Sequence, residues 1–132
     1  MPEDALLTLR LPSRPEAAAA ARTALAALNG DLHLISAPRL ADAQLLLSEL
    51  VTNAVRHGGS DSVATVIIHM AASRDCIRIE VSDRGAGFAP ASITRPPSGE
   101  PGGRGLFVVD AIADRWGTAR HERHCVWLER RR

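Results

Sequence analysis

Alternating apolar and polar positions predict five β-strands in this chain. In the first of them Leu7, Leu9 and Leu11 share one side, and Pro12 ends the run. Two apolar runs in the middle of the chain are separated by a short polar turn, which is typical of neighbouring strands. The predicted strands are residues 5–11, 63–70, 76–82, about 116–120 and about 125–129.

Apolar positions that recur every three to four residues predict three helices. The first is rich in Ala, the strongest helix former, and Ser13 with Glu16 forms a capping-box pattern at its start. Glycine is expected to end the first helix near Gly30 and the second at Gly58. The predicted helices run from 13 to about 30, from just after 36–38 to 58, and from about 105 to 114.

The order of these elements indicates an α+β fold rather than repeated strand–helix–strand units. We expect a two-layer α/β sandwich, in which a mixed and mostly antiparallel sheet carries helices on one face. The length predicts a single domain over residues 1–132, large enough to bury roughly 65–70% of the surface that the unfolded chain exposes.

Charge and composition exclude several kinds of chemistry. Sixteen basic and 15 acidic residues give a net charge of +1, so no nucleic-acid partner is expected. Every Lys or Arg position is Arg, which excludes the Walker A loop and the protein-kinase fold, because both place a lysine on the phosphates. No apolar run approaches the ~20 residues of a membrane span. Without a signal-peptide pattern, Cys76 and Cys125 are expected to be reduced core thiols in a cytoplasmic protein.

The second helix carries the first candidate for chemistry, the segment Glu49-Leu-Val-Thr-Asn53-Ala-Val-Arg-His57-Gly58. Glu49 and Asn53 lie one turn apart with Arg56 alongside, so their side chains can enter one cavity. Asn offers a hard oxygen to Mg²⁺, and Glu can take a proton from a nucleophile or a metal-bound water. The alternative is a solvated polar stripe. We expect Leu45 and Leu46 to flank the polar pair, and the opposite face to pack on the sheet through Leu40, Ala43, Leu47, Leu50, Val51 and Ala54.

The second candidate follows a strand and reads Asp83-Arg-Gly85-Ala-Gly87. A buried carboxylate there can accept a hydrogen bond from the exocyclic amine of adenine, whereas guanine would present a carbonyl and be repelled. The glycines permit positive φ angles and a close approach of the backbone to a flat base. The alternative is an ordinary strand-to-loop turn. A dinucleotide-binding motif is excluded, because a proline-rich loop follows and not a helix.

The third candidate is Gly103-Arg104-Gly105 at the start of the last helix. Unpaired backbone N–H groups and the positive end of the helix dipole favour phosphate there, and Arg104 adds charge. The alternative is a flexible loop that meets a helix.

Residues 89–104 form a long loop, which is usually functional or disordered. The side chains of His121, His124 and Cys125 could in principle bind a metal, but a solvated hairpin turn and a core thiol are the expected interpretation.

Taken in order, the three segments resemble the N, G1 and G2 boxes of the GHKL (histidine kinase-like) ATPase superfamily. They are most similar to the small anti-sigma-factor serine/threonine kinases of bacteria. The resemblance covers nearly the whole chain, from the Leu7 strand to Leu128, and the segment from Ser48 to Gly58 is its most specific part. It implies the Bergerat-type ATP-binding fold.

This resemblance also implies roles for individual residues. Glu49 would be the general base, Asn53 the Mg²⁺ ligand and Asp83 the adenine anchor, while residues 89–102 would form an ATP lid. The residues then expected to contact ATP are Asn53, Arg56, His57, Asp83, Gly85, Gly87, Gly103, Arg104, Gly105 and Leu106.

The implied partners are proteins. Ala21-Arg22-Thr23 on the first helix is similar to the stretch through which such kinases meet their sigma factor, so Arg22 is the expected contact. The implied activity transfers the γ-phosphate of ATP to a Ser or Thr of a small antagonist (anti-anti-sigma) protein, while the same domain sequesters a sigma factor. A homodimer remains open, and no membrane partner is expected.

Three other hypotheses compete with the kinase. A nucleotide-gated binding module without phosphotransfer is favoured by the short lid and by Arg123-His124-Cys125, where the family often has a Gly-Thr pair; Glu49 favours the kinase. A detached histidine-kinase catalytic domain is less favoured, because no helix hairpin with a phosphoacceptor histidine is recognisable. An ATPase of the gyrase or chaperone kind is less favoured still, because no transducer domain is recognisable.

Overall fold

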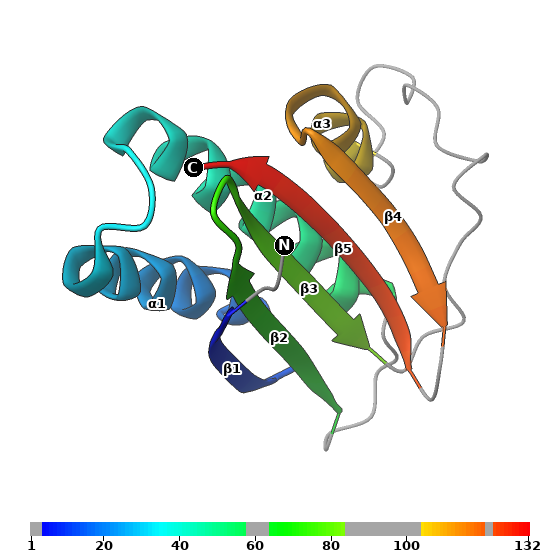
Figure 1. The fold of residues 1–132 in the computed structure, drawn as a ribbon. Helices are drawn as coiled ribbons and strands as arrows, with labels where there is room; N and C mark the ends of the chain where they lie inside the picture. Colours follow the sequence, from blue (N-terminus) through cyan, green and yellow to red (C-terminus); the bar gives the residue numbers. More distant parts are fainter. Residues whose placement is uncertain (1–3, 58–63, 84–103, 121–122) are drawn as a thin grey trace.

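The computed structural model describes residues 4–57, 64–83, 104–120 and 123–132, and these form three helices and one five-stranded sheet (Figure 1). The helices are α1 (Ala17–Leu32), α2 (Ala37–His57) and α3 (Arg104–Ile112). The strands are β1 (Asp4–Pro12), β2 (Thr65–Ala72), β3 (Cys76–Asp83), β4 (Arg115–Arg120) and β5 (His124–Arg131). Each predicted element is present, with ends that differ by a few residues.

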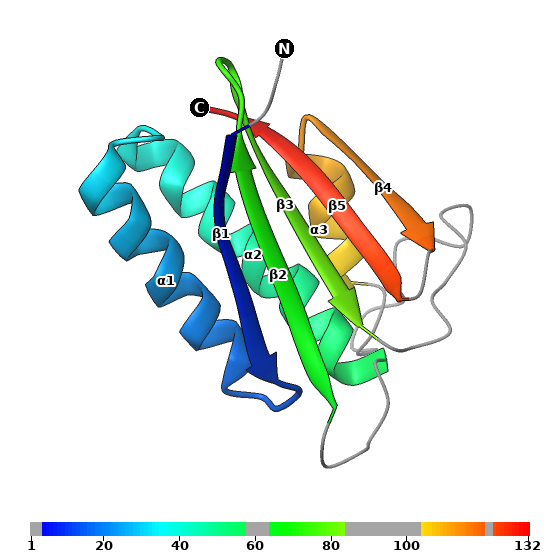
Figure 2. The same ribbon diagram turned by 60° about the horizontal axis from the view of Figure 1, so that its bottom comes forward.

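The sheet has the strand order β1-β2-β3-β5-β4, and every pairing among the described residues is antiparallel. In the middle of the sheet, Ile79 of β3 lies opposite Met70 of β2 and Leu128 of β5. These three side chains are buried on one face, as strand alternation requires. All three helices lie on that face (Figure 2), so the predicted two-layer α+β architecture is confirmed.

Helix α2 is the centre of the helical layer. It packs against α1 on one side, α3 on the other and β3 beneath. The predicted sheet-facing residues of α2 are buried, apart from half-buried Leu40. Of the two leucines expected to flank the polar pair, Leu46 is 0% exposed and Leu45 is 41% exposed. A helix covered on three sides buries a wider arc than its contact with the sheet alone requires.

Both ends of α1 differ from the prediction. The N-cap residue is Glu16, without a side-chain capping hydrogen bond, so no capping box forms. The Ser13 backbone N–H instead donates to the Ala64 carbonyl at 3.0 Å, which extends the contact between the β1 and β2 ends. At the other end the helix passes through Gly30 and stops when His33 adopts a left-handed conformation with φ of 50°.

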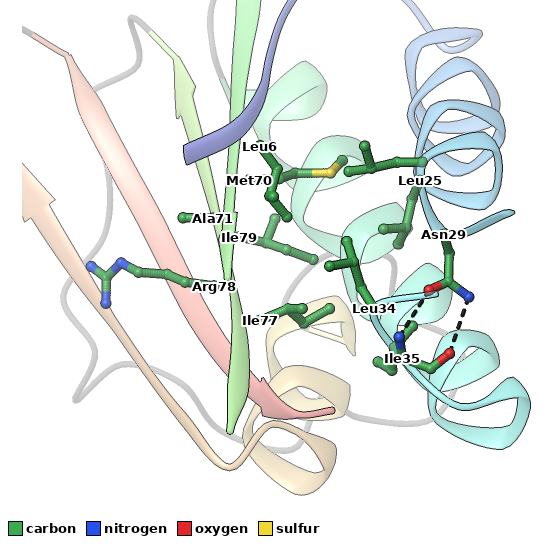
Figure 3. A pocket seen from close by; sticks show the side chains of 11 residues that line it. Leu6, Leu25, Asn29, Leu34, Ile35, Met70, Ala71, Ile77, Arg78 and Ile79 are labelled. Atoms are coloured by element: carbon green, nitrogen blue, oxygen red, sulfur yellow. Dashed lines mark hydrogen bonds between the residues drawn. The ribbon is translucent and has the colours of Figure 1, made fainter. Parts of the chain in front are cut away.

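The connection between α1 and α2 is closed by Asn29. Its side chain accepts a hydrogen bond from the Ile35 N–H (2.8 Å) and donates to the Ile35 carbonyl (3.1 Å), as Figure 3 shows. The space beside this link is lined by side chains of α1, the connection and the sheet, among them Leu25, Leu34 and Met70. Its volume is about 10 Å³, which is at the limit for one water molecule, so it offers no room for a nucleotide.

The outer face of the sheet carries an aromatic and charged cluster. The guanidinium of Arg78 lies 4.3 Å from the centre of the Trp127 ring, and that of Arg115 lies 5.8 Å from it. Gly117 on β4 leaves room for the ring, because a Cβ there would come within 2.9 Å of it. Cys76 and Cys125 are free, half-buried thiols on β3 and β5, so they are not residues of the core between the layers.

Arg130 ties the end of β5 to the helical layer. Its guanidinium contacts Asp42 of α2 at 2.9 Å and Asp114 at 3.3 Å. Asp114 also accepts a hydrogen bond from the Arg131 N–H at 2.8 Å, and this bond, with the charge of Arg130, holds the pKa of Asp114 below its ordinary value. These contacts fix α2 on the sheet. Among the described residues, no helix is both long and apolar enough to cross a membrane.

Candidate functional site

The polar pair of α2 lies at the edge of the buried surface. Glu49 and Asn53 are both half-buried, whereas Thr52 and Arg56 on the same helix are exposed. The two side chains of the pair are therefore partly covered by neighbouring residues and partly open. His57 is the last residue of α2, and its side chain lies outside the described part of the chain.

Asp83 ends β3 on the inner side of the sheet. It continues the stripe of Ile77, Ile79 and Val81, whose side chains face the helical layer. The residue is only 4% exposed. Its carboxylate therefore lies on the face of the sheet that the helices cover. A turn residue would instead point into water.

His124 lies directly opposite Asp83 in the register of β3 and β5. It begins the inner stripe that continues with Val126 and Leu128, and it is 5% exposed. Its Nδ1 is 3.6 Å from Oδ2 of Asp83, which is longer than a hydrogen bond and makes an ion pair only when the imidazole is protonated. The predicted β4–β5 hairpin is present, but the expectation that His124 is solvated was wrong.

The neighbours of His124, Arg123 and Cys125, make different contacts. Nη2 of Arg123 donates to the carbonyl oxygens of Thr65 (2.5 Å) and Ser82 (3.3 Å), so its guanidinium links the start of β2 to the end of β3. Cys125 faces the outer side of the sheet, and burial raises the pKa of its thiol, which keeps the sulfur protonated. Side chains of adjacent strand residues point to opposite faces, so His124 and Cys125 cannot ligate one metal ion together. Within the described residues, no group of three or more His, Cys, Asp or Glu side chains could hold a metal ion.

The start of α3 offers its backbone to the candidate site and one side chain to the hydrophobic core. Arg104 and Gly105 are the first two residues of the helix, which therefore begins one residue earlier than predicted. Leu106 is buried in the hydrophobic core, so only its backbone remains a candidate for contact with a phosphate. Gly85, Gly87, Gly103 and residues 89–102 lie outside the described residues, and their roles stay predictions.

These features gather at one end of the molecule. Figures 1 and 2 both show that the end of β3, the start of β5 and the end of α2 lie near one another, and α3 packs on α2. A buried carboxylate, a buried imidazole and a half-buried acid–amide pair are therefore brought to the same side of the sheet. Carboxylate and amide oxygens are hard donors of the kind that Mg²⁺ prefers, so the chemistry of Asn53 fits that ion.

Arg22 lies on a different surface, between α1 and α2. It is exposed, and its Nη1 donates to Oγ of Ser48 at 2.9 Å, so it is anchored to the residue before Glu49. Gln44 donates to the Arg22 carbonyl at 3.3 Å. Further along the same two helices, a groove of about 310 Å³ is lined by Pro15, Ala18, Thr52, Val55 and Arg56.

Comparisons with known proteins show the family of this chain. The histidine kinase-like ATPase domain family matches residues 11–130, and the chain belongs to this family. Two curated proteins named serine-protein kinase RsbW are similar to it. The one from Oceanobacillus iheyensis is 29% identical over 119 residues, and the one from Listeria innocua is 30% identical over 121 residues. In both cases the match covers 82% of this chain and 75% of the relative.

A solved structure has the same fold. The RsbU and RsbW domains of Rv1364c from Mycobacterium tuberculosis align with a TM-score of 0.66 at 20% identity, over 99% of this chain and 32% of that one. The chain thus spans about a third of this structural neighbour. The resemblance read from the three segments is confirmed by the family match and by these relatives.

The burial of His124 opposite Asp83 was not expected from the motifs. The sequence pattern places His124 beside a hairpin turn, where a solvated side chain is expected. Strand alternation carried a usable signal: Val126 and Leu128 are apolar at every second position, and His124 continues that stripe.

Proposed function

We propose that this chain binds ATP with Mg²⁺ and transfers the γ-phosphate to a Ser or Thr hydroxyl of a small antagonist protein, and that it sequesters a sigma factor. The observation that supports this best is the burial of Asp83 at the end of β3, facing the helical layer. A carboxylate held there suits the exocyclic amine of adenine. The serine-kinase names of the two relatives support the class of reaction.

Glu49 and Asn53 have different roles in the proposed reaction. In the transfer, the hydroxyl oxygen forms a bond to the γ-phosphorus while the bond to the bridging oxygen of ADP breaks, and the hydroxyl proton passes to the Glu49 carboxylate. Asn53 would hold Mg²⁺, which neutralises charge on the phosphates. Both side chains are half-buried, so each is partly held by neighbouring residues and still open to a ligand, which suits these roles.

The test of the nucleotide site is calorimetric. We expect ATP and ADP to bind with Mg²⁺ and GTP to bind at least about 100-fold more weakly, because a site built for one hydrogen-bonding pattern leaves its buried groups unpaired with another. Asp83→Asn should lose most of the affinity for ATP, since the amide presents donors as well as an acceptor. Asp75→Asn, at an exposed turn, is the matched control. Equal affinity for the three nucleotides, or unchanged ATP binding by Asp83→Asn, would contradict the proposal.

The proposed partner surface is α1 around Arg22. Arginine is enriched at protein–protein hot spots, and the bond to Ser48 holds this guanidinium in place at little further entropic cost on binding. We expect Arg22→Ala to weaken binding of the cognate sigma factor or antagonist by ~2 kcal/mol, about 30-fold, without changing the affinity for ATP. Arg10→Ala, an exposed arginine on β1, should change neither.

That measurement uses sigma-factor and antagonist proteins encoded near the gene for this chain, with titration by surface plasmon resonance. Partner binding that is equal for Arg22→Ala and the unaltered chain would move the interface away from α1. It would leave the nucleotide site untouched, because the two are tested with separate ligands.

A second candidate function is a nucleotide-gated binding module without phosphotransfer. It is favoured by one observation at the entry to β5, where the family often has a Gly-Thr pair. There this chain has Arg123, which links two strands, and His124, whose imidazole is buried. The two functions share the ATP site and differ in turnover. A chain that binds ATP and partner but transfers no phosphate would be the module.

A further inference from the structure

The contact between Asp83 and His124 goes beyond the proposed nucleotide site, because nothing in the motifs assigns a role to a histidine there. We propose that His124 is a positioning residue: it holds the Asp83 carboxylate in its buried orientation and thereby sets the selectivity of the site for adenine over guanine. The inference rests on the proposed function, since it concerns the base-recognition end of that site.

The pair is fixed by the fold on both sides. Asp83 and His124 are opposite one another in antiparallel register, and each ends an inner stripe of buried apolar side chains. Their side chains are 5% and 6% exposed, with Nδ1 and Oδ2 3.6 Å apart. Arg123 bonds to the Ser82 carbonyl next to Asp83, so the backbone at this strand end is held as well.

Burial makes the imidazole important to the carboxylate. An ionised carboxylate away from water is costly unless polar or positive groups lie close to it. His124 supplies such a group from the facing strand. A carboxylate offers several lone-pair directions on its two oxygens, so proximity of Oδ2 to the imidazole is compatible with accepting a hydrogen bond from a base.

Loss of the imidazole has a specific consequence for base selection. Without this neighbour, the buried carboxylate is held less firmly and can turn away from the base. A carboxylate turned away from the base no longer accepts a hydrogen bond from the amine of adenine and no longer repels the carbonyl of guanine. Removal of His124 should therefore weaken ATP binding and relieve the rejection of GTP, whereas simple loosening of the fold would weaken both nucleotides together.

The experiment compares His124→Asn with His124→Gln by calorimetry, using ATP and GTP with Mg²⁺. The amide nitrogen of Asn can occupy the position of Nδ1, and that of Gln lies nearer to Nε2. We expect Asn to keep the GTP-to-ATP ratio of dissociation constants within about threefold of the unaltered chain, and Gln to lower that ratio by about tenfold or more. The control is Cys125→Ala. Cys125 follows His124 in the chain and faces the opposite side of the sheet, so this variant should leave the ratio unchanged.

Two outcomes would overturn the role of His124: a Gln variant that keeps the original ratio, or an Asn variant that loses it as fully as Gln. Thermal unfolding without nucleotide, measured for each variant, establishes that the folded proteins are being compared. Failure of the proposed function is recognised separately, because the unaltered chain would then not bind ATP or would bind it independently of Asp83.

Discussion

Glu49→Gln should keep the affinity for ATP and lose phosphotransfer by roughly 10²–10⁴-fold, which is the usual contribution of a positioned general base. The two side chains have nearly the same shape, but the amide cannot take the proton of the attacking hydroxyl. Glu49 is half-buried one turn before Asn53, so the substitution also leaves the proposed Mg²⁺ ligand in place.

Transfer of labelled γ-phosphate to a cognate antagonist, measured at saturating ATP, gives the rate, and calorimetry gives the affinity. Glu80→Gln is the matched control, because Glu80 is also half-buried but pairs with Arg78 on the outer face of the sheet. Asn53→Ala should give the opposite pattern and lose Mg²⁺-dependent binding. Undiminished transfer by Glu49→Gln would remove this residue from catalysis. Absence of transfer by the unaltered chain would favour the binding module.

Leu46→Ala should lower the free energy of unfolding by about 2–5 kcal/mol, the range measured for buried leucines. Its side chain is 0% exposed within the core cluster, so truncation removes apolar contact and leaves a cavity. Leu45→Ala is the matched control on the same helix. It should change the free energy of unfolding by no more than about 0.5 kcal/mol, because Leu45 is 41% exposed.

Urea unfolding, followed by circular dichroism, measures both variants under one set of conditions. Alanine is as good a helix former as leucine, so the difference between the variants reports packing and not helix propensity. An equal effect of the two substitutions would contradict the burial of Leu46.

Local patterns predicted the helices and strands because the apolar residues of each element recur with a clear period. The sheet-facing stripe of α2 was readable from its leucines, since a 3.6-residue repeat places them on one side. The burial of Leu46 was not predicted by that stripe, since α2 is covered by α1 and α3 as well as by the sheet. The capping box at Ser13 failed for a related reason: the N–H of Ser13 bonds to Ala64, a partner that no local pattern reveals.

The candidate site was predictable in part. Glu49, Asn53 and Asp83 were found because their residue types and neighbours form recognisable segments, and the structure gives each a setting with restricted access to water. The pairing of His124 with Asp83 was not predictable from either segment, because strand register brings the two residues together across two strands. The register of β3 and β5 depends on the whole sheet, so a single segment does not specify it.

The two tryptophans are placed so that each reports on a different side of the sheet. Trp116 lies against the core, and its indole N–H donates to Asp110 of α3 at 2.9 Å, while Trp127 lies on the outer face between two guanidinium groups. Because the chain has no tyrosine, its ultraviolet emission comes almost entirely from these two rings. Replacing either one with phenylalanine therefore leaves a single intrinsic fluorophore, which distinguishes events in the helical layer from events on the exposed face of the sheet.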